Sequence, residues 1–314
     1  MLQSAMLFDS YTIMTNKSIK FLALISLSVL ASCASKQTDS IDGAAVDIGD
    51  LSQDGVQVQN LTTPPGFKQG DKLVAYEGPG WESDRVGYRL YLDGRNAIDI
   101  FGKRTTELVL SDVGRGEDYH AMADWGMDIL KVGNSLGSGG FGIYKNGEVI
   151  QIGDAEGYSA TVMEDKADKA SLKVIHKNSK ACGGDVTGTY TIKKASRLTE
   201  IRVDGSCEQN YAAGLIIHPE TVEIKSSNES EWGYLGRYGE QSLVPDNLGF
   251  ALFYKTDSVE AVGRDEDDSY IVFKPNVAPH YYMGAAWEQE VDGLKTENEF
   301  RAWLTETQMR LNAQ

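Results

Sequence analysis

Two short runs, Gly188-Thr189-Tyr190-Thr191-Ile192-Lys193 and Leu198-Thr199-Glu200-Ile201-Arg202-Val203, give the clearest indication of the fold. Apolar and polar side chains alternate in both runs, which is the period of a β-strand with one buried face. The polar segment 194–197 between them is short enough to be a hairpin turn. The two runs are therefore predicted to form a β-hairpin whose turn lies near residue 195.

Further strands are predicted around this hairpin. Five runs are rich in β-branched and aromatic residues, and turn-forming pairs such as Asp93-Gly94 and Asp204-Gly205 separate several of them. These runs are 88–92, 97–101, 171–176, 221–224 and 270–273. With 33 Gly and 15 Tyr in the chain, the pattern predicts an all-β domain over residues 71–314, a large, supersandwich-like antiparallel β-sandwich.

One helix is predicted near the end of the sequence. Thr296-Glu297-Asn298-Glu299 fits a capping box. Phe300, Trp303, Leu304 and Leu311 can then share one face of the helix. This C-terminal helix is expected to pack against a sheet, and we assign it no function.

The N-terminus has the features of an export signal. Lys17 and Lys20 precede the apolar run 21–30, and Leu30-Ala31-Ser32-Cys33 follows. A basic region, a short apolar stretch and small residues are typical of a secretory signal, here residues 1–32. The ending resembles a bacterial lipobox, which implies a lipid on Cys33. An ordinary signal peptide with an unrelated cysteine is the alternative.

Localisation and tether follow from that interpretation. The protein is expected to be exported and lipid-anchored in the periplasm or outer membrane of a Gram-negative bacterium. Ala34-Ser35 lacks an aspartate retention signal, which favours the outer membrane. Residues 33–70 are rich in small and polar residues and are predicted to be a flexible tether.

The two remaining cysteines, Cys182 and Cys207, lie at similar distances on either side of the predicted turn. They should meet at the open end of the hairpin, and an exported compartment permits a disulfide. Such a bond is worth roughly 3 kcal/mol for a loop of this size. Reduced thiols or a metal-binding pair are the alternatives.

The formal net charge of −16 argues against a nucleic-acid partner and against binding to an anionic membrane surface. An acidic ligand remains compatible with this charge if arginine and lysine gather locally.

The segment from Asp118 to Asp128 is unusually polar. Tyr119, His120, Trp125 and three aspartates lie within eleven residues, without a helical or strand period. Polar groups at this density must find partners if they are buried. A loop that carries chemistry and a solvated acidic loop are the two interpretations.

Histidine is scarce, with four residues in the chain. His120, His218 and His280 lie beside Tyr, Pro or Trp at predicted strand ends, whereas His176 alternates within a strand. Histidine titrates near neutral pH, so these three are acid–base candidates, although a structural role is the alternative for each. The spacing shows no HxH or HxxxH pair, so no cofactor is required, but a divalent metal held from distant strands remains open.

Several aromatic residues are candidate platforms for sugar rings. They are Trp81, Trp125, Tyr281, Tyr282 and Trp287. The alternative is that they are large core residues. The glycine-rich run 137–142 lacks the Lys-Ser/Thr of a phosphate loop, so a close backbone approach is the better explanation.

Several motifs resemble a known family. They are Trp81-Glu82-Ser83-Asp84-Arg85-Val86-Gly87-Tyr88-Arg89, Asp99-Ile100-Phe101-Gly102-Lys103, Asp118-Tyr119-His120 through Gly126-Met127-Asp128, and Gly139-Gly140-Phe141-Gly142. In this order they resemble an uncharacterised-domain family of exported proteins from bacterial polysaccharide-utilisation loci, over roughly residues 70–310. This family is similar to the oligosaccharide dehydratase of ulvan degradation, which implies removal of water from a terminal uronic acid to give a 4,5-unsaturated sugar.

Such an elimination needs three kinds of group. A cation must offset the substrate carboxylate, a base must remove the C5 proton, and an acid must protonate the leaving hydroxyl. The candidate cations are Arg85, Lys103 and Arg104. The candidate bases are His120, His218 and His280, and the candidate acids are Tyr119, Tyr281 and Tyr282.

Three other functions remain open. A glycoside hydrolase would use paired carboxylates, and acidic residues are abundant here. A surface lipoprotein that captures glycans would bind the same acidic oligosaccharide without forming a product. A purely structural lipoprotein would do neither.

Overall fold

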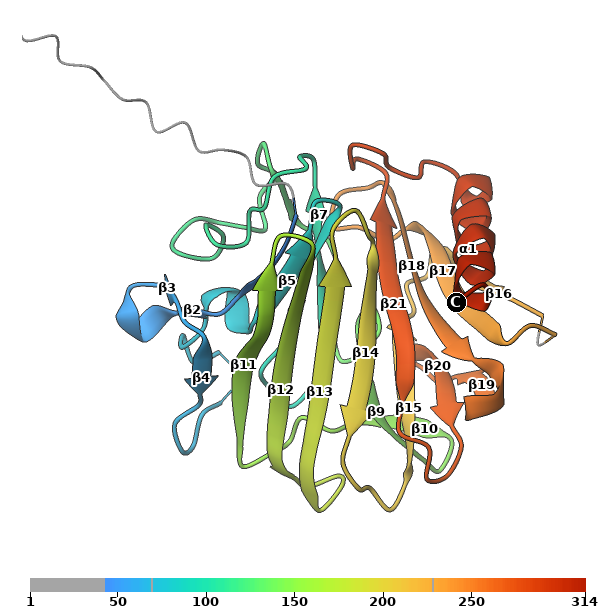
Figure 1. Ribbon diagram of the computed structural model, residues 1–314, viewed down its shortest axis with the longest axis horizontal. Coiled ribbons are helices and arrows are strands. Elements are labelled where there is room, and N and C mark those ends of the chain that lie inside the picture. The colour runs from blue at the N-terminus through green and yellow to red at the C-terminus, as the bar shows by residue number, and fades with distance from the viewer. Residues whose placement is uncertain (1–42, 69, 228) are drawn as a thin grey trace, which may run out of the picture. The chain divides into compact units, whose positions relative to one another are not determined.

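Nine antiparallel strands form the largest sheet of the computed structural model, which describes residues 43–68, 70–227 and 229–314. In Figure 1 most of this sheet faces the viewer, from β11 across to β18. Its strands, in spatial order, are β16 (Thr221–Lys225), β17 (Trp232–Glu240), β18 (Asn247–Lys255), β21 (His280–Trp287), β14 (Leu198–Asp204), β13 (Gly184–Lys193), β12 (Lys169–Ser179), β11 (Gly157–Lys166) and β4 (Asn60–Thr62).

Two five-stranded antiparallel sheets lie behind the large one (Figure 1). The first contains, in order, β1 (Ala44–Asp47), β5 (Gly80–Ser83), β6 (Val86–Leu90), β7 (Ile98–Lys103) and β8 (Gly126–Asp128). The second contains β10 (Glu148–Gln151), β9 (Phe141–Lys145), β15 (Asn210–Ile216), β20 (Asp268–Phe273) and β19 (Val259–Arg264). The described residues also include a ribbon of β2 (Gly49–Asp50) and β3 (Val56–Gln57), and the 3₁₀ turns η1 (Leu51–Gln53), η2 (Ala75–Glu77) and η3 (Thr256–Ser258).

One apolar core joins the layers. The Trp81 ring of β5 stacks on Tyr190 of β13, with 4.9 Å between ring centroids. Phe273 of β20 contacts Tyr281 of β21 at 5.8 Å. Aromatic pairs at these separations add to the free energy gained from burying their area. The predicted large antiparallel β-sandwich is therefore confirmed.

The hairpin predicted from residues 188–203 is β13 and β14. Tyr190 lies opposite Ile201, and both side chains are fully buried. Thr189 and Arg202, the neighbouring pair, face outward. The alternation of apolar and polar residues thus sets which side chains enter the core.

The predicted disulfide is present. Pairing between β13 and β14 extends as far as Thr187 and Asp204, and Cys182 bonds Cys207 just beyond that end. The bond closes the open end of the hairpin, as its symmetric spacing about the turn predicts.

The predicted C-terminal helix is α1 (Glu297–Asn312). Its capping box is complete: Thr296 accepts a hydrogen bond from the Glu299 N–H, and the Glu299 carboxylate accepts one from the Thr296 N–H. Phe300 and Leu304 are buried against β17 and β18, on the outer face of the large sheet (Figure 1). The helix therefore covers an apolar part of that face.

The tether predicted for residues 33–70 requires a correction. β1 pairs with β5, and β4 forms one edge of the large sheet. Val46 and Ile48 are fully buried. Composition misled here because two well-placed apolar side chains suffice to hold so short a strand. Residues 1–42, which include the predicted signal, Cys33 and the start of the tether, lie outside the described residues.

The glycine-rich run 137–142 serves close backbone packing. Gly137 has a φ of 71°, and a Cβ there would lie 2.1 Å from the Ile98 carbonyl oxygen. At Gly139 a Cβ would lie 2.7 Å from Cβ of Met283. Only glycine fits such positions without moving the neighbouring backbone.

Candidate functional site

The segment 104–125 covers the outer face of β6, β7 and β8. Phe101 and Tyr76 form a small apolar cluster there with Leu110 and Val113. Tyr119 and Trp125 pack against this cluster while keeping part of their surface exposed. The polar segment predicted to carry chemistry is thus a structured cover on the sheet.

A buried ion pair fixes this cover to the sheet. The Lys103 ammonium lies 2.6 Å from Glu82 and donates a second hydrogen bond to the Ser83 carbonyl at 2.7 Å. The other Glu82 oxygen accepts the backbone N–H groups of Val109 and Leu110. Burial raises the pKa of Glu82, and Lys103 opposes that shift. The prediction that Lys103 binds a substrate carboxylate is wrong, because its charge is enclosed and already paired.

Arg89 is a fully buried guanidinium on the outer face of β6. Its Nη2 lies 2.7 Å from Asp99 on β7 and 2.6 Å from Asp128 on β8. Nη1 donates to the Tyr76 carbonyl at 2.9 Å, and Nη2 donates to the Tyr91 hydroxyl. The Arg89 guanidinium therefore links three strands and forms ion pairs with two carboxylates.

The backbone beside Arg89 is strained. Tyr76 has a φ of 42° and Glu77 a φ of 67°, although neither is a glycine. Such conformations cost of order 1–3 kcal/mol each and concentrate at functional sites. Here the turn presents the Tyr76 carbonyl oxygen to the buried guanidinium.

Asp128 is a buried carboxyl group with a raised pKa. Burial raises its pKa well above the usual range, the Asp99 charge raises it further, and Arg89 opposes both effects. Its Oδ1 has no well-aligned hydrogen-bond partner among the described residues. A buried carboxylate with an unused lone pair is costly unless another group completes it.

His120 lies directly beside Asp128. Its Nε2 is 3.4 Å from Asp128 Oδ2, and its Nδ1 is 3.5 Å from Asp118 Oδ1. The imidazole is 54% exposed, while the Asp128 side chain is only 2% exposed. The site thus combines an accessible imidazole with a buried carboxylate beneath it.

Tyr119 completes the group. Its ring contacts that of His120, with 4.3 Å between centroids, and its hydroxyl lies 3.3 Å from Arg89 Nη1. Burial raises the pKa of Tyr119, whereas the Arg89 charge favours the phenolate. The structure therefore brings the predicted Tyr119 and His120 together and adds Arg89 and Asp128 behind them.

Arg104 and Trp125 lie at the two ends of the covering segment. The Arg104 N–H donates to the Trp125 carbonyl at 2.7 Å. Arg104 is exposed, and no hydrogen bond or ion pair of its guanidinium occurs among the described residues. Both predicted residues thus belong to the same loop as His120.

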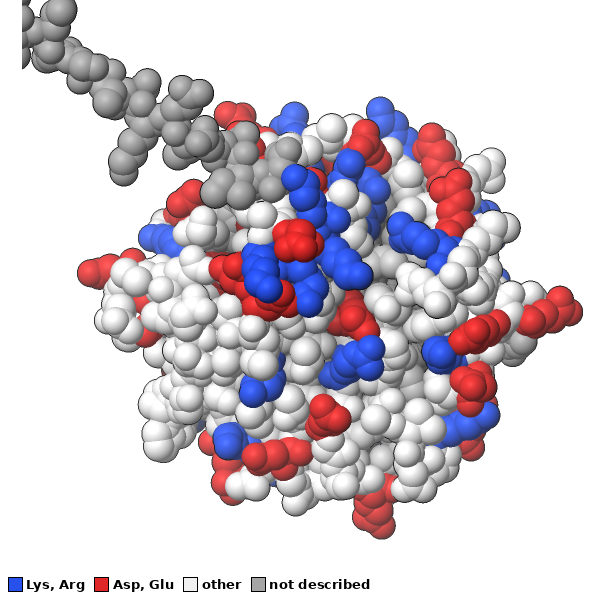
Figure 2. All heavy atoms as spheres, in the orientation of Figure 1, with Lys and Arg blue, Asp and Glu red and all other residues white. Residues whose placement is uncertain are grey.

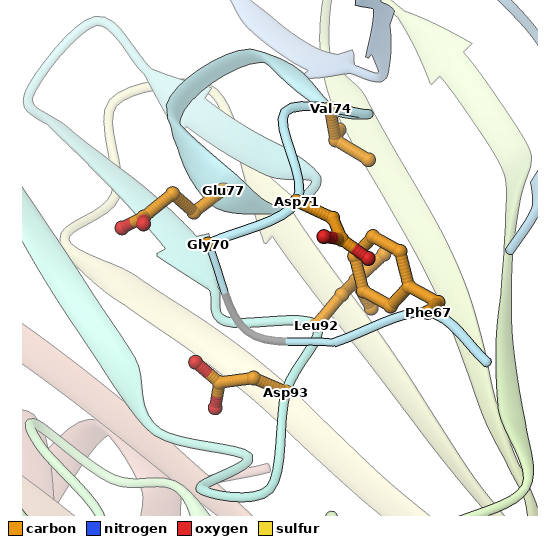
Figure 3. Close-up of a pocket in the computed structure, with 7 residues that line it drawn as sticks. All are labelled: Phe67, Gly70, Asp71, Val74, Glu77, Leu92 and Asp93. Atoms are coloured by element: carbon orange, nitrogen blue, oxygen red, sulfur yellow. The ribbon is translucent and has the colours of Figure 1, made fainter.

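A small cavity is lined by Glu77 of η2, by the segment before η2 and by Leu92 and Asp93 (Figure 3). Its volume is about 10 Å³, which suits one water and is far below the roughly 300 Å³ of a small ligand site. Glu77 lines it, and the charge of Glu77 also raises the pKa of Tyr119 and Asp128. The cavity is therefore linked to the site only by the electrostatic effect of Glu77, and it is too small to hold a sugar.

His218 lies in a separate environment. His218 follows β15, where it interacts with the Lys131 backbone and with the charge of Arg237. Burial lowers its pKa. Its Nε2 is buried without a hydrogen-bond partner among the described residues. It shares none of these contacts with His120.

His280 and Tyr282 lie on the outer face of the large sheet, on β21. His280 Nε2 is 2.9 Å from Glu200, and the Tyr282 ring contacts Trp232 at 5.4 Å. They neighbour each other, with 5.7 Å between their rings. The structure therefore places His280 and Tyr282 on a different face from Tyr119 and His120.

Trp81 and Tyr281 are fully buried, which corrects their prediction as sugar platforms. Trp81 donates to the Thr199 hydroxyl at 2.8 Å, and Tyr281 donates to the Gly139 carbonyl at 2.8 Å. Both fill the space between the sheets. Trp287, the fifth predicted platform, is also fully buried.

Arg85 lies on the turn between β5 and β6 and forms an ion pair with Asp292. This pair is exposed, so its contribution to stability is small and a ligand can compete for the guanidinium. Arg85 shares no contact with the His120 cluster.

The part of the chain that the structure describes shows neither a metal-binding cluster nor a membrane-spanning helix. No group of three or more His, Cys, Asp or Glu side chains there has the geometry to hold a metal ion. Within the same residues, no helix has the length and apolar character needed to cross a membrane.

Sequence reasoning missed Arg89, Asp99 and Asp128 as one unit. A signal for the first pair exists: Arg89 and Asp99 lie symmetrically about Gly94 in the predicted Asp93-Gly94 turn, and they are cross-strand partners. Two opposite charges within otherwise apolar strands indicate a buried pair. Asp128 follows a long connection, and no comparable spacing rule predicts its place.

Comparison with protein families places the chain in one of them. No curated protein matches the chain. A model of a protein family described as a domain of unknown function, DUF4861, matches residues 30–314. The match covers nearly the whole sequence, and the chain therefore belongs to the DUF4861 family.

Proposed function

We propose that the protein is a carbohydrate lyase that removes water, or a glycosidic leaving group, from a uronic-acid residue of an acidic oligosaccharide. The product is a 4,5-unsaturated sugar, as in ulvan breakdown. The observation that carries this proposal is the exposed His120 imidazole beside buried Asp128, with the Tyr119 hydroxyl held by Arg89. An accessible base and an adjacent acid are what an elimination requires.

His120 is the proposed base. Asp128 faces Nε2 and favours the tautomer protonated on that nitrogen, which leaves the Nδ1 lone pair on the exposed side of the ring, near Asp118. When Nδ1 accepts the C5 proton, the ionised Asp128 carboxylate stabilises the positive charge of the imidazolium. Burial and the Asp99 charge raise the pKa of Asp128, whereas the Arg89 guanidinium favours its ionised form, in which it can accept a hydrogen bond.

Tyr119 is the proposed acid. Its hydroxyl gives a proton to the departing oxygen at C4, so that water leaves as the C4–C5 double bond forms. The C5–H and C4–O bonds break in the same reaction. The phenolate that remains lies 3.3 Å from the Arg89 guanidinium, which stabilises its charge. The proton on the imidazolium can then return to the phenolate through solvent.

Arg104 is the proposed partner of the substrate carboxylate. Of the three predicted cations, Lys103 is enclosed by Glu82 and Arg85 is paired with Asp292. Arg104 is exposed on the loop that carries His120. Its charge offsets the carboxylate and makes the C5 proton easier to remove.

The test is incubation with a glucuronate-terminated ulvan oligosaccharide. We expect near-ultraviolet absorbance to rise as the conjugated alkene forms. His120→Gln and Tyr119→Phe should each lower turnover by roughly 10²–10⁴-fold, the usual contribution of one acid–base group. His218→Gln is the matched control and should retain activity. Melting temperatures measured alongside show whether each variant is folded.

Other outcomes are distinguishable. New reducing ends without absorbance indicate a hydrolase, and tight binding without product indicates a glycan-binding lipoprotein. No absorbance change across a panel of uronides overturns the proposal, and so does loss of turnover in His218→Gln with full turnover in His120→Gln.

A further inference from the structure

A cavity of about 270 Å³ lies between the C-terminal end of α1 and the outer face of β13, β14 and β21. It is lined by Thr191, Lys193, Lys194, Glu200, Tyr282 and Arg310, among others. Its volume is close to the lower limit of about 300 Å³ for small-ligand sites. It can therefore accommodate a unit of about one sugar ring.

The cavity is basic although the protein is acidic. Lys193 and Arg310 are exposed, and the described residues offer neither of them an ion-pair partner. Lys194 also lines the cavity, but the charge available to a ligand is that of Lys193 and Arg310. Figure 2 shows lysine and arginine side chains, with acidic side chains among them, near the upper ends of β12 and β13 beside this part of the face. A cluster of this sign on a chain of net charge −16 attracts anions locally.

Glu200 is the acidic side chain in the cavity lining, and its charge is already paired. Glu200 accepts hydrogen bonds from His280 at 2.9 Å and from Arg202 at 2.5 Å. The His280 hydrogen bond is the larger cause of its lowered pKa, about 2. Glu200 therefore repels an anionic ligand less than its charge suggests.

Tyr282 supplies an aromatic wall. It is half-buried, and its ring is supported from behind by Trp232. Thr191 and Ser196 add hydroxyl groups to the lining. An aromatic ring for C–H faces, hydroxyls for hydrogen bonding and cations for charge together suit a sugar that carries an anionic group.

We propose that this cavity binds an anionic sugar residue, carboxylated or sulfated, as a second and non-catalytic glycan site. It lies on the outer face of the large sheet, whereas His120 lies on the outer face of β6–β8. The identification of the ligand with the enzyme's own substrate class rests on the proposed function. The charge and ring chemistry of the cavity do not depend on it.

The test localises binding by acetylating surface lysines and measuring the extent of modification by mass spectrometry. The protein is the full chain carrying His120→Gln, so that turnover does not alter the ligand. The probes are a glucuronate-terminated ulvan oligosaccharide, a neutral oligosaccharide of equal length and inorganic sulfate. We expect the acidic oligosaccharide to protect Lys193 and leave Lys145, exposed on β9, unprotected.

The second measurement is affinity by calorimetry. Lys193→Gln/Arg310→Gln should weaken this binding event about tenfold, the effect of roughly 1.4 kcal/mol. Lys145→Gln/Arg264→Gln changes the net charge equally on another sheet and should have no effect.

Three results overturn the proposal. The first is equal protection of Lys193 and Lys145, and the second is an equal effect of the two double variants on affinity. The third is that sulfate or the neutral oligosaccharide protects Lys193 as well as the acidic oligosaccharide does. Because Lys193 protection is measured without turnover, failure of this site and failure of the elimination reaction are separate findings.

Discussion

At the scale of single residues, charges buried in pairs decide which side chains remain for chemistry. Arg89 is shared by Asp99 and Asp128, and Lys103 is held by Glu82. Removing one partner of such a pair leaves an uncompensated buried charge. His120, by contrast, is half-exposed and can exchange protons with a ligand.

The Lys103 pair makes a prediction about stability. Lys103→Met should lower the free energy of unfolding by about 3–5 kcal/mol, because it leaves Glu82 charged and buried. Adding Glu82→Gln should recover most of that loss, since glutamine stays neutral and can still accept the Val109 and Leu110 amides. Urea denaturation measures both variants. A single variant as stable as the parent would mean that Lys103 is not structural.

Asp268 predicts a pH dependence. Burial raises its pKa to about 8, against the hydrogen bonds that it accepts from the Leu136 N–H. A carboxyl group with a raised folded-state pKa contributes stability at low pH and loses it as pH rises through about 8. Asp268→Asn should therefore show a smaller fall in the free energy of unfolding between about pH 5 and about pH 8. The difference from the parent should exceed about 1.4 kcal/mol, the equivalent of a tenfold change in proton affinity. Equal falls in urea titrations of the two proteins would contradict this.

At the scale of elements, α1 packs closely on the large sheet because a glycine in β18 leaves room for an aromatic side chain of the helix. A Cβ on Gly249 of β18 would lie 2.4 Å from the Phe300 ring. The ring is fully buried in this space. The helix position therefore depends on one glycine.

Gly249→Ala tests this dependence. It should cost roughly 1–3 kcal/mol, the usual effect of overpacking. Phe300→Leu in the same background should restore part of the loss by removing the clashing ring atoms. Gly184→Ala in β13, where a Cβ meets open space, is the control. Thermal melting that ranks the control below Gly249→Ala would refute the interpretation.

The sequence predicts elements better than it predicts their exposed faces. Alternation placed Tyr190 and Ile201 in the core, and the capping box placed the start of α1 at Thr296. Trp81 follows Gly78-Pro79-Gly80 and resembles a loop residue, yet β5 begins at Gly80 and directs the ring into the sandwich. Which face a short strand buries depends on the strands beside it, and the local sequence does not identify those neighbouring strands.

The candidate site shows the same limit at longer range. Tyr119 and His120 could be selected because the segment is so polar. Their contacts with Arg89 and Asp128 depend on how the 104–125 segment folds back over β7. That path is fixed by Glu82, a residue distant in sequence, so local patterns do not reveal it.

At the scale of the whole molecule, the N-terminal sequence makes a prediction about location. Cys33→Ser removes the thiol that the lipobox resemblance assigns to a lipid. On the predicted lipid anchoring, the variant should then move from the membrane fraction to the soluble fraction with an unchanged melting temperature. Protein that stays with the membrane after this change would show that Cys33 is not the anchor.

The attachment of the 104–125 segment has a consequence for how related sequences can diverge. Val109 and Leu110 are held by Glu82, Arg115 binds Asp47, and the Tyr119 carbonyl accepts the Asp128 N–H. The exposed stretches between these attachment points can accept substitutions without displacing His120. On the proposed function, family members with different substrates should vary in those stretches and retain the attachments, so that new specificities evolve while Tyr119 and His120 keep their places.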